Sequence, residues 1–397
     1  MKIYTISSVH NEQDIIESLC RYHLQFCDGM IIYDSCNQDN TLEILRQLME
    51  EGLNIHLVEE EVLKPFMRPG KTHLDAMIQM AFDRFGVDLV LPIDADEFLF
   101  CPGGGNPREV LESFASGMEY WIPWRTYTFV QEETDNTKFL PGHFPFRRSN
   151  EIPQFYKVAV SRKLWISYRC LLARGAHSLV FKNSTDRAAV PVEYTSSLFY
   201  AHYPIRSRFQ AIRKCIEMEF ILSCNTDRFS GEGYQYQWWF DRIMGTGTLT
   251  DEEVRRFSLR YAVPEDVPEE AISLLEDPPD ISFADEEAVL LKYTDYSANQ
   301  NHIFRMIVSE SYRIICSLTD ALRRERQMGQ VLRELETLEN FLRETSEEGI
   351  KKAANHIFEQ VKLNFKKIEN SPEQHLAARF RAVLSRVKNY LLNPQAP

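Results

Sequence analysis

The first hundred residues alternate short apolar runs with stretches in which apolar residues recur every three or four positions. A short apolar run between polar residues predicts a buried strand, and the longer spacing predicts an amphipathic helix. Strands that alternate with helices favour a parallel α/β sheet with right-handed crossovers. The predicted strands are Lys2–Ser7, Met30–Tyr33, Asn54–Val58 and Asp88–Ile93, and the predicted helices are Asn11–Phe26, Asp39–Leu48 and Lys71–Phe85.

Beyond residue 100 the strands become shorter and richer in aromatic residues, which predicts an α+β half. Thr250 and Glu253 have the spacing of a capping box at a helix start. Residues 263–284 are acidic and proline-rich, as in a linker, and residues 285–397 carry amphipathic stripes that favour an appended helical region. The other predicted elements are strands at Tyr120–Trp124, Tyr127–Val130, Lys157–Ser161, Ser178–Phe181 and Leu198–Tyr200 and a helix at Arg206–Leu222.

Composition narrows the classes of function. The chain has 397 residues, of which 44% are hydrophobic, so it can build a sizeable core. Its net charge of −13 argues against a broad nucleic-acid surface. The eight cysteines contain no CxxC pair, so a zinc ribbon is not indicated and reduced thiols in a cytosol are expected. No apolar stretch reaches the roughly 18 residues of a membrane span.

The most informative segment is Asp88–Glu97, an apolar run that ends in three carboxylates, Asp94, Asp96 and Glu97. In open α/β sheets, ligands bind just beyond the carboxyl ends of the strands. Like charges this close repel each other unless a cation lies between them, and hard divalent ions such as Mg²⁺ or Mn²⁺ prefer oxygen ligands. The segment therefore predicts a metal site, and the alternative is an acidic, solvated turn.

Two more polar clusters follow predicted strands. Asn11 and Glu12 come after the first strand, and the segment from Asp34 to Asp39 comes after the second. Because parallel strands end at the same edge of a sheet, all three clusters are expected to converge there. Each also has a structural alternative: Asn11 and Asp39 as helix caps, and Asp34 as a turn residue.

In this order, these residues resemble the nucleotide-sugar glycosyltransferases of the GT-A fold, in particular family-2-like bacterial members. Asp94-Ala95-Asp96 stands as the DxD signature, and Ala201–Ser207 is similar to the histidine-bearing segment of that family. The resemblance covers about half the chain. It implies a GT-A domain at 1–262, with a nucleotide-binding half at 1–100 and an acceptor-side half at 101–262. Gln235–Trp239 lacks the arginine of the processive Gln-x-x-Arg-Trp signature, which weighs against a polysaccharide synthase.

The resemblance also implies roles for single residues. A divalent metal, Mn²⁺ or Mg²⁺, would be held by Asp96 and Asp94, with His202 as a further ligand and His177 as its rival. Sugar transfer with inversion needs a carboxylate base on the acceptor side. The implied nucleotide-sugar contacts are Ser8, Asn11, Glu12, Asp34, Arg68, Lys71, Asp94 and Ala95, and the candidate bases are Glu132, Glu133, Asp135 and Glu151.

The expected function is metal-dependent transfer of a sugar from a nucleotide donor, a UDP-sugar first, to a glycan or lipid-linked acceptor in bacterial surface-polysaccharide synthesis. A cytoplasmic protein is expected, with peripheral contact to the inner membrane face and self-association through the C-terminal helices. One alternative is a nucleotidyltransferase acting on a sugar phosphate, although Ser7–His10 is not the glycine-rich loop that such enzymes carry. The other is a catalytically degenerate nucleotide-binding or assembly protein.

Overall fold

The computed structural model describes residues 1–35, 37–67, 72–130, 140–224, 233–281 and 291–294. The chain divides into two compact units. The first comprises Met1–Arg206 and Val263–Tyr296, and the second comprises Ser207–Ala262 and Ser297–Pro397. The predicted boundary at residue 262 coincides with one break of this division and the one at residue 284 does not, and the predicted domain organisation stays a prediction. The predicted C-terminal helices, with their stripes beyond residue 294, lie outside the described residues.

The first unit is built on a nine-stranded mixed sheet. Its strands are β1 (Ile3–Val9), β2 (Gly29–Asp34), β3 (Ile55–Val58), β4 (Leu89–Pro92), β5 (Glu97–Phe100), β6 (Glu119–Thr126), β8 (Tyr156–Ser161), β11 (Val192–Tyr194) and β12 (Phe199–His202). The order is β3-β2-β1-β4-β8-β6-β12-β5, with β11 also on β6. Strands β1 to β4 pair in parallel, whereas β8 is antiparallel to both β4 and β6. This mostly parallel sheet confirms the predicted α/β fold class.

Strand direction decides which loops meet. Because β8 is antiparallel to β4 and to β6, strand β6 runs in the direction of β4, and β12 is parallel to β6. The carboxyl ends of β1, β2, β4, β6 and β12 therefore lie at one edge of the sheet. The last strand, β5, returns antiparallel to β12.

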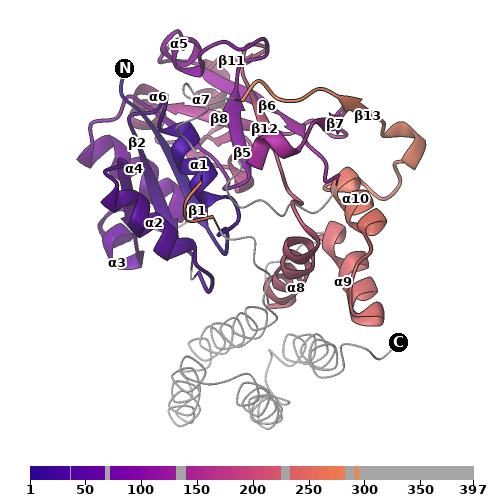
Figure 1. Ribbon diagram of the computed structural model, residues 1–397. Helices are drawn as coiled ribbons and strands as arrows, with labels where there is room; N and C mark the ends of the chain where they lie inside the picture. Colours follow the sequence, from indigo (N-terminus) through magenta and orange to yellow (C-terminus); the bar gives the residue numbers. More distant parts are fainter. Residues whose placement is uncertain (36, 68–71, 131–139, 225–232, 282–290, 295–397) are drawn as a thin grey trace, which may run out of the picture. The chain divides into compact units, whose positions relative to one another are not determined.

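Helices surround this sheet, and those of the first hundred residues gather around β1 and β2 (Figure 1). Helix α4 packs on the face of β1 that carries Tyr4 and Ile6 and brings Ile78 and Phe82 into the core. The helices of the unit are α1 (Ile16–His23), α2 (Thr41–Glu50), α3 (Glu60–Leu63), α4 (His73–Arg84), α5 (Pro107–Glu112), α6 (Arg162–Tyr168) and α7 (Ser184–Ala189), with 3-10 turns at Lys64–Phe66, Leu140–His143, Arg174–Ala176 and Glu269–Ala271.

Two small antiparallel pairs complete the first unit. One joins β9 (Leu171–Leu172) to β10 (Leu179–Val180), and the other joins β7 (Phe146–Arg148) to β13 (Leu274–Glu276). The described part of the second unit holds α8 (Arg208–Cys224), α9 (Tyr234–Thr246) and α10 (Asp251–Arg260). Helix α10 begins with the predicted capping box of Thr250 and Glu253.

Two local predictions were wrong. Asn11 does not cap α1, because its φ of 58° is left-handed and the helix begins only at Ile16. Residues 127–130 do not form a strand, and their contribution to a ladder is a single bridge from Tyr127 to Arg147. Tyr127 and Phe129 are nevertheless fully buried, so an apolar segment without regular pairing produced a strand-like pattern. Strand β5 was missed because it directly follows the acidic turn.

Candidate functional site

The acidic loop after β4 carries two aspartates with different surroundings. The side chain of Asp94 is 54% exposed, whereas that of Asp96 is only 8% exposed. A tight turn holds the loop, because the Glu97 N–H donates to the Asp94 carbonyl at 3.2 Å. The Asp94 N–H in turn donates to the Glu97 carboxylate at 2.8 Å. The two carboxylates of the DxD motif are thus presented separately and not as one pair.

Asp96 lies beside His202, the last residue of β12. Pairing of β12 with β5 sets His202 opposite Glu97, and the Tyr203 N–H donates to the Asp96 carbonyl at 2.8 Å. The His202 Nε2 and Asp96 Oδ1 atoms are 3.8 Å apart. The imidazole stacks on the Trp124 indole with ring centroids 4.1 Å apart, which restricts its orientation. Strand pairing therefore brings together a carboxylate and an imidazole that are far apart in the sequence.

Arg206 ties the loops at this edge together. Its buried guanidinium donates to Glu12 Oε2 at 2.5 Å and to Asp14 Oδ2 at 2.7 Å. Its Nη1 lies 3.8 Å from Asp96 Oδ2. The buried cation of Arg206 thus lies among carboxylates of the loops after β1 and β4. Glu12 is engaged in this ion pair, which gives it a structural partner in addition to its predicted role.

Lys157 holds the other aspartate. Its side chain, in β8, is 1% exposed, and Nζ lies 2.7 Å from Asp94 Oδ2 and 3.3 Å from Glu97 Oε2. Burial raises the pKa of Glu97, and the cation of Lys157 opposes that effect. Burial alone would lower the pKa of Lys157, but the charges of Asp94 and Glu97 outweigh it and raise this pKa. Sequence reasoning missed Lys157, because one lysine in an apolar strand carries no motif.

The loops after β1 and β2 brace each other. Asn11 Oδ1 accepts from the Gln38 N–H at 2.7 Å, and the Asn11 N–H donates to Asn37 Oδ1 at 2.6 Å. Asp34 Oδ1 accepts from the backbone and side-chain N–H groups of Asn37. Among the described residues, Asp34 Oδ2 has no partner, so it is open to a ligand. Strand register sets the nearby Ser8, whose side chain is exposed, opposite Tyr33.

Glu151 is the candidate base that the structure describes, and its carboxylate is already engaged. It accepts from the Thr126 N–H at 2.5 Å and from the Thr126 hydroxyl at 3.0 Å, and it pairs with Arg148 at 3.0 Å. These bonds hold the carboxyl end of β6. Ala95 is buried in the acidic loop. The other candidates, Glu132, Glu133, Asp135, Arg68 and Lys71, lie outside the described residues.

The rival histidine, His177, sits in a different environment. Its Nδ1–H donates to the Tyr156 carbonyl at 2.7 Å, and its ring packs against Trp124 and Phe155, each at a centroid distance of 5.3 Å. Burial lowers the pKa of His177. Both histidines thus touch the same indole, but it is His202 whose ring nitrogen approaches a carboxylate of the DxD motif.

The fit of a metal ion rests on two side chains. Within the described part of the chain, no three histidine, cysteine or acidic residues are grouped as a ready-made metal site. Asp96 and His202 supply one carboxylate and one imidazole, a donor pair that suits Mn²⁺. Such a site would need its remaining ligands from phosphate oxygens and water, which is how divalent ions bind at phosphate-handling sites.

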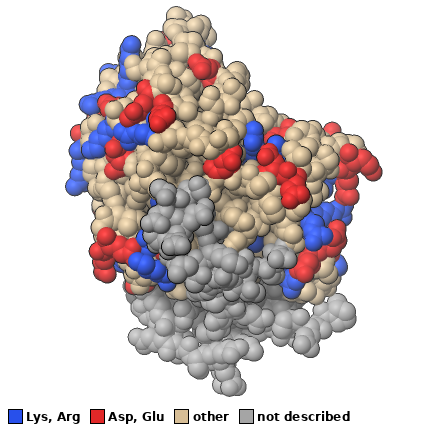
Figure 2. Space-filling view, turned by 45° about the horizontal axis from the view of Figure 1, so that its top comes forward, with Lys and Arg blue, Asp and Glu red and all other residues tan. Residues whose placement is uncertain are grey.

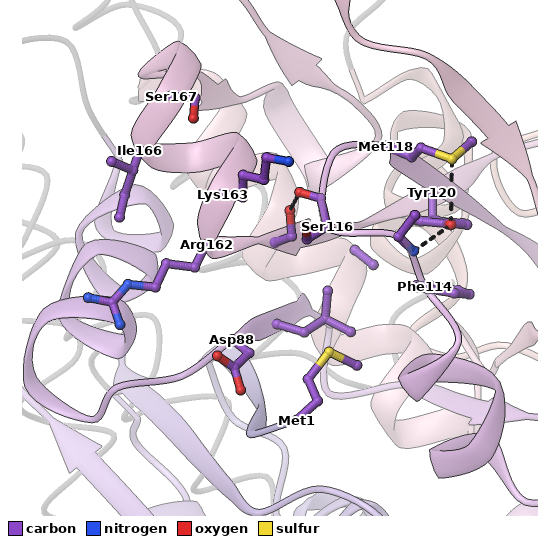
Figure 3. A pocket seen from close by; sticks show the side chains of 14 residues that line it. Met1, Asp88, Phe114, Ser116, Met118, Tyr120, Arg162, Lys163, Ile166 and Ser167 are labelled. Carbon is purple, nitrogen blue, oxygen red and sulfur yellow. Dashed lines mark hydrogen bonds between the residues drawn. The ribbon is translucent and has the colours of Figure 1, made fainter.

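Two surface features lie apart from this site. A cavity of about 390 Å³ lies at the opposite edge of the sheet, because it is lined by Asp88 before β4 and by Ser161 at the end of antiparallel β8 (Figure 3). On the face drawn in Figure 2, basic and acidic side chains occur in small interspersed groups, without an extended basic area. No helix in the described ranges is long and apolar enough to cross a membrane.

No protein-family model matches the chain, and no curated protein matches it either. Among solved structures, it is similar to glucosyl-3-phosphoglycerate synthase from Mycobacterium tuberculosis in complex with phosphoglyceric acid. That match has 15% identity and a TM-score of 0.31 and covers 70% of this chain and 90% of that one. The same enzyme in complex with Mn²⁺ and UDP-glucose matches at 20% identity and a TM-score of 0.23. This second match covers 31% of this chain and less than half, 44%, of that one.

Two further solved structures are similar. A mannosyltransferase from Pyrobaculum calidifontis in complex with GDP-Man and Mn²⁺ has 13% identity and a TM-score of 0.25, over 98% of this chain and 87% of that one. The 4-diphosphocytidyl-2C-methyl-D-erythritol synthase from Anaerococcus prevotii has 14% identity and a TM-score of 0.26, over 49% and 89%. These likenesses are too weak to carry a function. The chain's own sheet, with acidic loops gathered at the carboxyl ends of β1, β2 and β4, is the GT-A-like, Rossmann-type arrangement that the motifs predict.

Proposed function

We propose that this protein is a metal-dependent GT-A glycosyltransferase that moves a sugar from a nucleoside diphosphate donor, a UDP-sugar first, to a glycan or lipid-linked acceptor. The observation that carries the proposal is the approach of His202 to Asp96 within 3.8 Å, at the sheet edge where the loops after β1 and β2 also end. A carboxylate and an imidazole at the carboxyl edge of a parallel sheet suit the binding of a metal diphosphate.

In this proposal, different described residues contact different parts of the donor. Asp34, through Oδ2, and the exposed Ser8 would face the base and ribose at the ends of β2 and β1. Asp96 and His202 would hold the metal, which when bound would stabilise the charge that develops on the leaving diphosphate. Asp94, exposed and anchored through Oδ2, would present its other oxygen to hydroxyl groups of the donor sugar. Asp94 as a metal ligand remains the alternative role.

The catalytic base on the acceptor side is proposed from the chemistry of the reaction. Inverting transfer requires a base on the face opposite the leaving diphosphate. Glu151 is held by Thr126 and Arg148, which disfavours it as that base, so Glu132, Glu133 and Asp135 stand as the better candidates. The same proposal includes a surface-polysaccharide pathway, a cytoplasmic location and self-association through the C-terminal helices. Peripheral membrane contact would be made by the Lys and Arg residues of positions 351–388.

Calorimetry of UDP binding with and without Mn²⁺ tests the metal role. We expect Mn²⁺ to tighten UDP binding at least tenfold in the wild type, and Asp96→Ala to abolish that gain, because a ligand to the ion is lost. Asp94→Ala should weaken binding of the UDP-sugar, measured in the same way, less completely. Asp83→Ala, which removes an exposed carboxylate on α4, is the matched control and should bind like the wild type. Metal-independent UDP binding in both the wild type and Asp96→Ala would contradict the proposal.

Product analysis separates glycosyl transfer from the alternatives. A glycosyltransferase given a UDP-sugar releases UDP, through transfer or slow hydrolysis, whereas a nucleotidyltransferase given UTP and a sugar phosphate releases pyrophosphate. We expect UDP release in the first assay and no pyrophosphate in the second. Pyrophosphate release would favour nucleotidyl transfer, and tight UDP binding without either product would favour a catalytically degenerate protein.

A further inference from the structure

Lys157 is a buried lysine in the middle of an otherwise apolar sheet. It lies in β8, paired opposite Ile122 of β6, and its side chain is 1% exposed. A buried ammonium group costs several kcal/mol unless charged partners compensate for the lost water. Two carboxylates do so here, one from Asp94 and one from Glu97, which is itself fully buried.

The three side chains form a closed network. Lys157 Nζ contacts Asp94 Oδ2 at 2.7 Å and Glu97 Oε2 at 3.3 Å, and the same Glu97 oxygen accepts from the Asp94 N–H at 2.8 Å. Both the backbone and the carboxylate of Asp94 are therefore fixed relative to β8. The Lys157 contact holds Asp94 close to β8. Asp96 is held separately, by the Tyr203 N–H just after β12 and by Arg206.

We propose that Lys157 is a positioning residue that holds Asp94 for the hydroxyl groups of the donor sugar. The inference rests on the proposed function. It states that Lys157 increases the affinity for the sugar nucleotide relative to the affinity for the bare nucleoside diphosphate. Fixing one carboxylate oxygen removes the side-chain freedom of Asp94 before the sugar arrives, so less ordering is required on binding. If Lys157 only compensated the buried charge of Glu97, it would stabilise the fold and would not change the affinity for the sugar nucleotide relative to that for UDP.

The test uses the full chain in the presence of Mn²⁺ and compares affinities for UDP and for the best bound of UDP-glucose, UDP-galactose and UDP-N-acetylglucosamine. The main variant is Lys157→Met with Glu97→Gln, which replaces the buried ion pair by neutral side chains of similar length. We expect its UDP affinity to stay within twofold of the wild type and its affinity for the sugar nucleotide to fall at least tenfold. Glu97→Gln alone retains the Lys157–Asp94 contact. Its ratio of sugar-nucleotide affinity to UDP affinity should therefore equal that of the wild type.

A matched control removes the cationic partner of a buried carboxylate elsewhere in the sheet. Glu119 at the start of β6 is fully buried, pairs with Arg187 and accepts from the Leu179 N–H at 2.7 Å. Arg187→Met should lower the unfolding temperature, because it leaves a buried carboxylate without its cation, yet leave the ratio of the two affinities unchanged. If the main variant does not fold, Lys157→Arg replaces it. The planar guanidinium of the new arginine keeps the positive charge but changes the geometry of the contact with Asp94. The ratio of sugar-nucleotide affinity to UDP affinity should therefore fall at least threefold.

A double-mutant cycle shows whether Lys157 acts through Asp94. In an Asp94→Asn background, the Lys157 and Glu97 substitutions should cause no further loss of sugar-nucleotide affinity. Additive losses, or an unchanged affinity ratio in a folded Lys157 variant, would overturn the inference and leave the proposed function intact. A wild type that binds none of these nucleotides with Mn²⁺ would overturn the proposed function, and the inference with it.

Discussion

At the scale of single residues, the two aspartates of the DxD motif differ in what surrounds them. Asp94 is exposed and bound to Lys157, whereas Asp96 is buried between His202 and Arg206. Each carboxylate has its own cationic neighbour, Lys157 for Asp94 and Arg206 for Asp96. Their division of labour, with Asp94 toward the sugar and Asp96 toward a metal, follows from these neighbours and not from the motif.

Asp34 provides a residue-scale prediction. Asp34→Ala should weaken UDP binding by about 1–3 kcal/mol, because ligand donors lose a half-buried acceptor. Asp34→Asn separates the loss of the ligand contact from any loss of the turn. The asparagine side-chain oxygen can still accept from Asn37, as Asp34 Oδ1 does now. We expect Asn to keep the unfolding temperature and still weaken UDP binding, both measured on the same preparations. If UDP affinity stays within twofold in both variants, Asp34 is only a turn residue.

At the scale of elements, side chains at helix and strand ends hold the site's framework in place. Arg206 joins the loops after β1, β4 and β12, and Glu151 holds the end of β6. His23 does the same for α1 and β5: its Nδ1–H donates to the Leu19 carbonyl at 3.0 Å, and its Nε2 accepts from the Leu99 N–H at 3.4 Å. Both ring nitrogens are used by the neutral imidazole.

His23 gives a pH prediction for these elements. Burial lowers the pKa of His23 to about 4, below its ordinary value of 6.5. Between these values the unfolded chain binds a proton that the folded chain rejects, so stability is complete above about pH 6.5 and is lost as the pH falls toward 4. The difference corresponds to about 3 kcal/mol, at roughly 1.4 kcal/mol for each factor of ten in proton affinity.

Urea unfolding at pH 7 and pH 5 measures this effect. The wild type should lose about 2 kcal/mol more than His23→Gln between the two values, because glutamine does not titrate in this range. His23→Gln is itself expected to be less stable at pH 7, since it packs less well between α1 and β5. An equal loss in the two proteins would show that His23 is not a source of the acid sensitivity.

At the scale of the whole molecule, the segment after the second unit's helices returns to the sheet unit. Strand β13 pairs with β7, and Asp280 accepts from the Gly103 N–H at 2.6 Å. Farther along, the buried Glu17 of α1 accepts from the backbone N–H groups of Lys292, Tyr293 and Thr294, at 2.8 to 3.1 Å. The returning segment is thus attached to the rest of the sheet unit at β13, at Asp280 and at Lys292–Thr294.

Glu17 gives the prediction at this scale. Glu17→Gln removes the charge that receives three consecutive N–H groups, and hydrogen bonds to charged groups contribute about 1.5–3 kcal/mol. We expect amide hydrogen exchange at Lys292–Thr294 to accelerate at least tenfold, as followed by mass spectrometry. Glu43→Gln, at an exposed position in the first turn of α2, is the control and should exchange like the wild type. Unchanged protection in Glu17→Gln would show that the segment is held by other contacts.

Most of the parallel half of the sheet could be predicted from the sequence. β1, β2 and β4 are largely buried strands and β3 is half-buried, and all four have apolar patterns. The polar residues that follow β1, β2 and β4 reach one edge because parallel strands share a direction. Asn11 was misjudged as a cap because its pattern matches one, whereas its left-handed backbone serves contacts with the next loop.

The sequence by itself determined this protein's α/β class, its acidic motif and the strand ends that carry its polar loops, because these depend on local periodicity and on the direction shared by parallel strands. Only the tertiary structure decided that His202 lies closer than His177 to Asp96, that Arg206 joins three loops and that Lys157 holds Asp94. Those contacts come from the pairing of β12 with β5 and of β8 with β4 and β6. Pairings between distant segments depend on how the whole core packs, and no local pattern of residues encodes them.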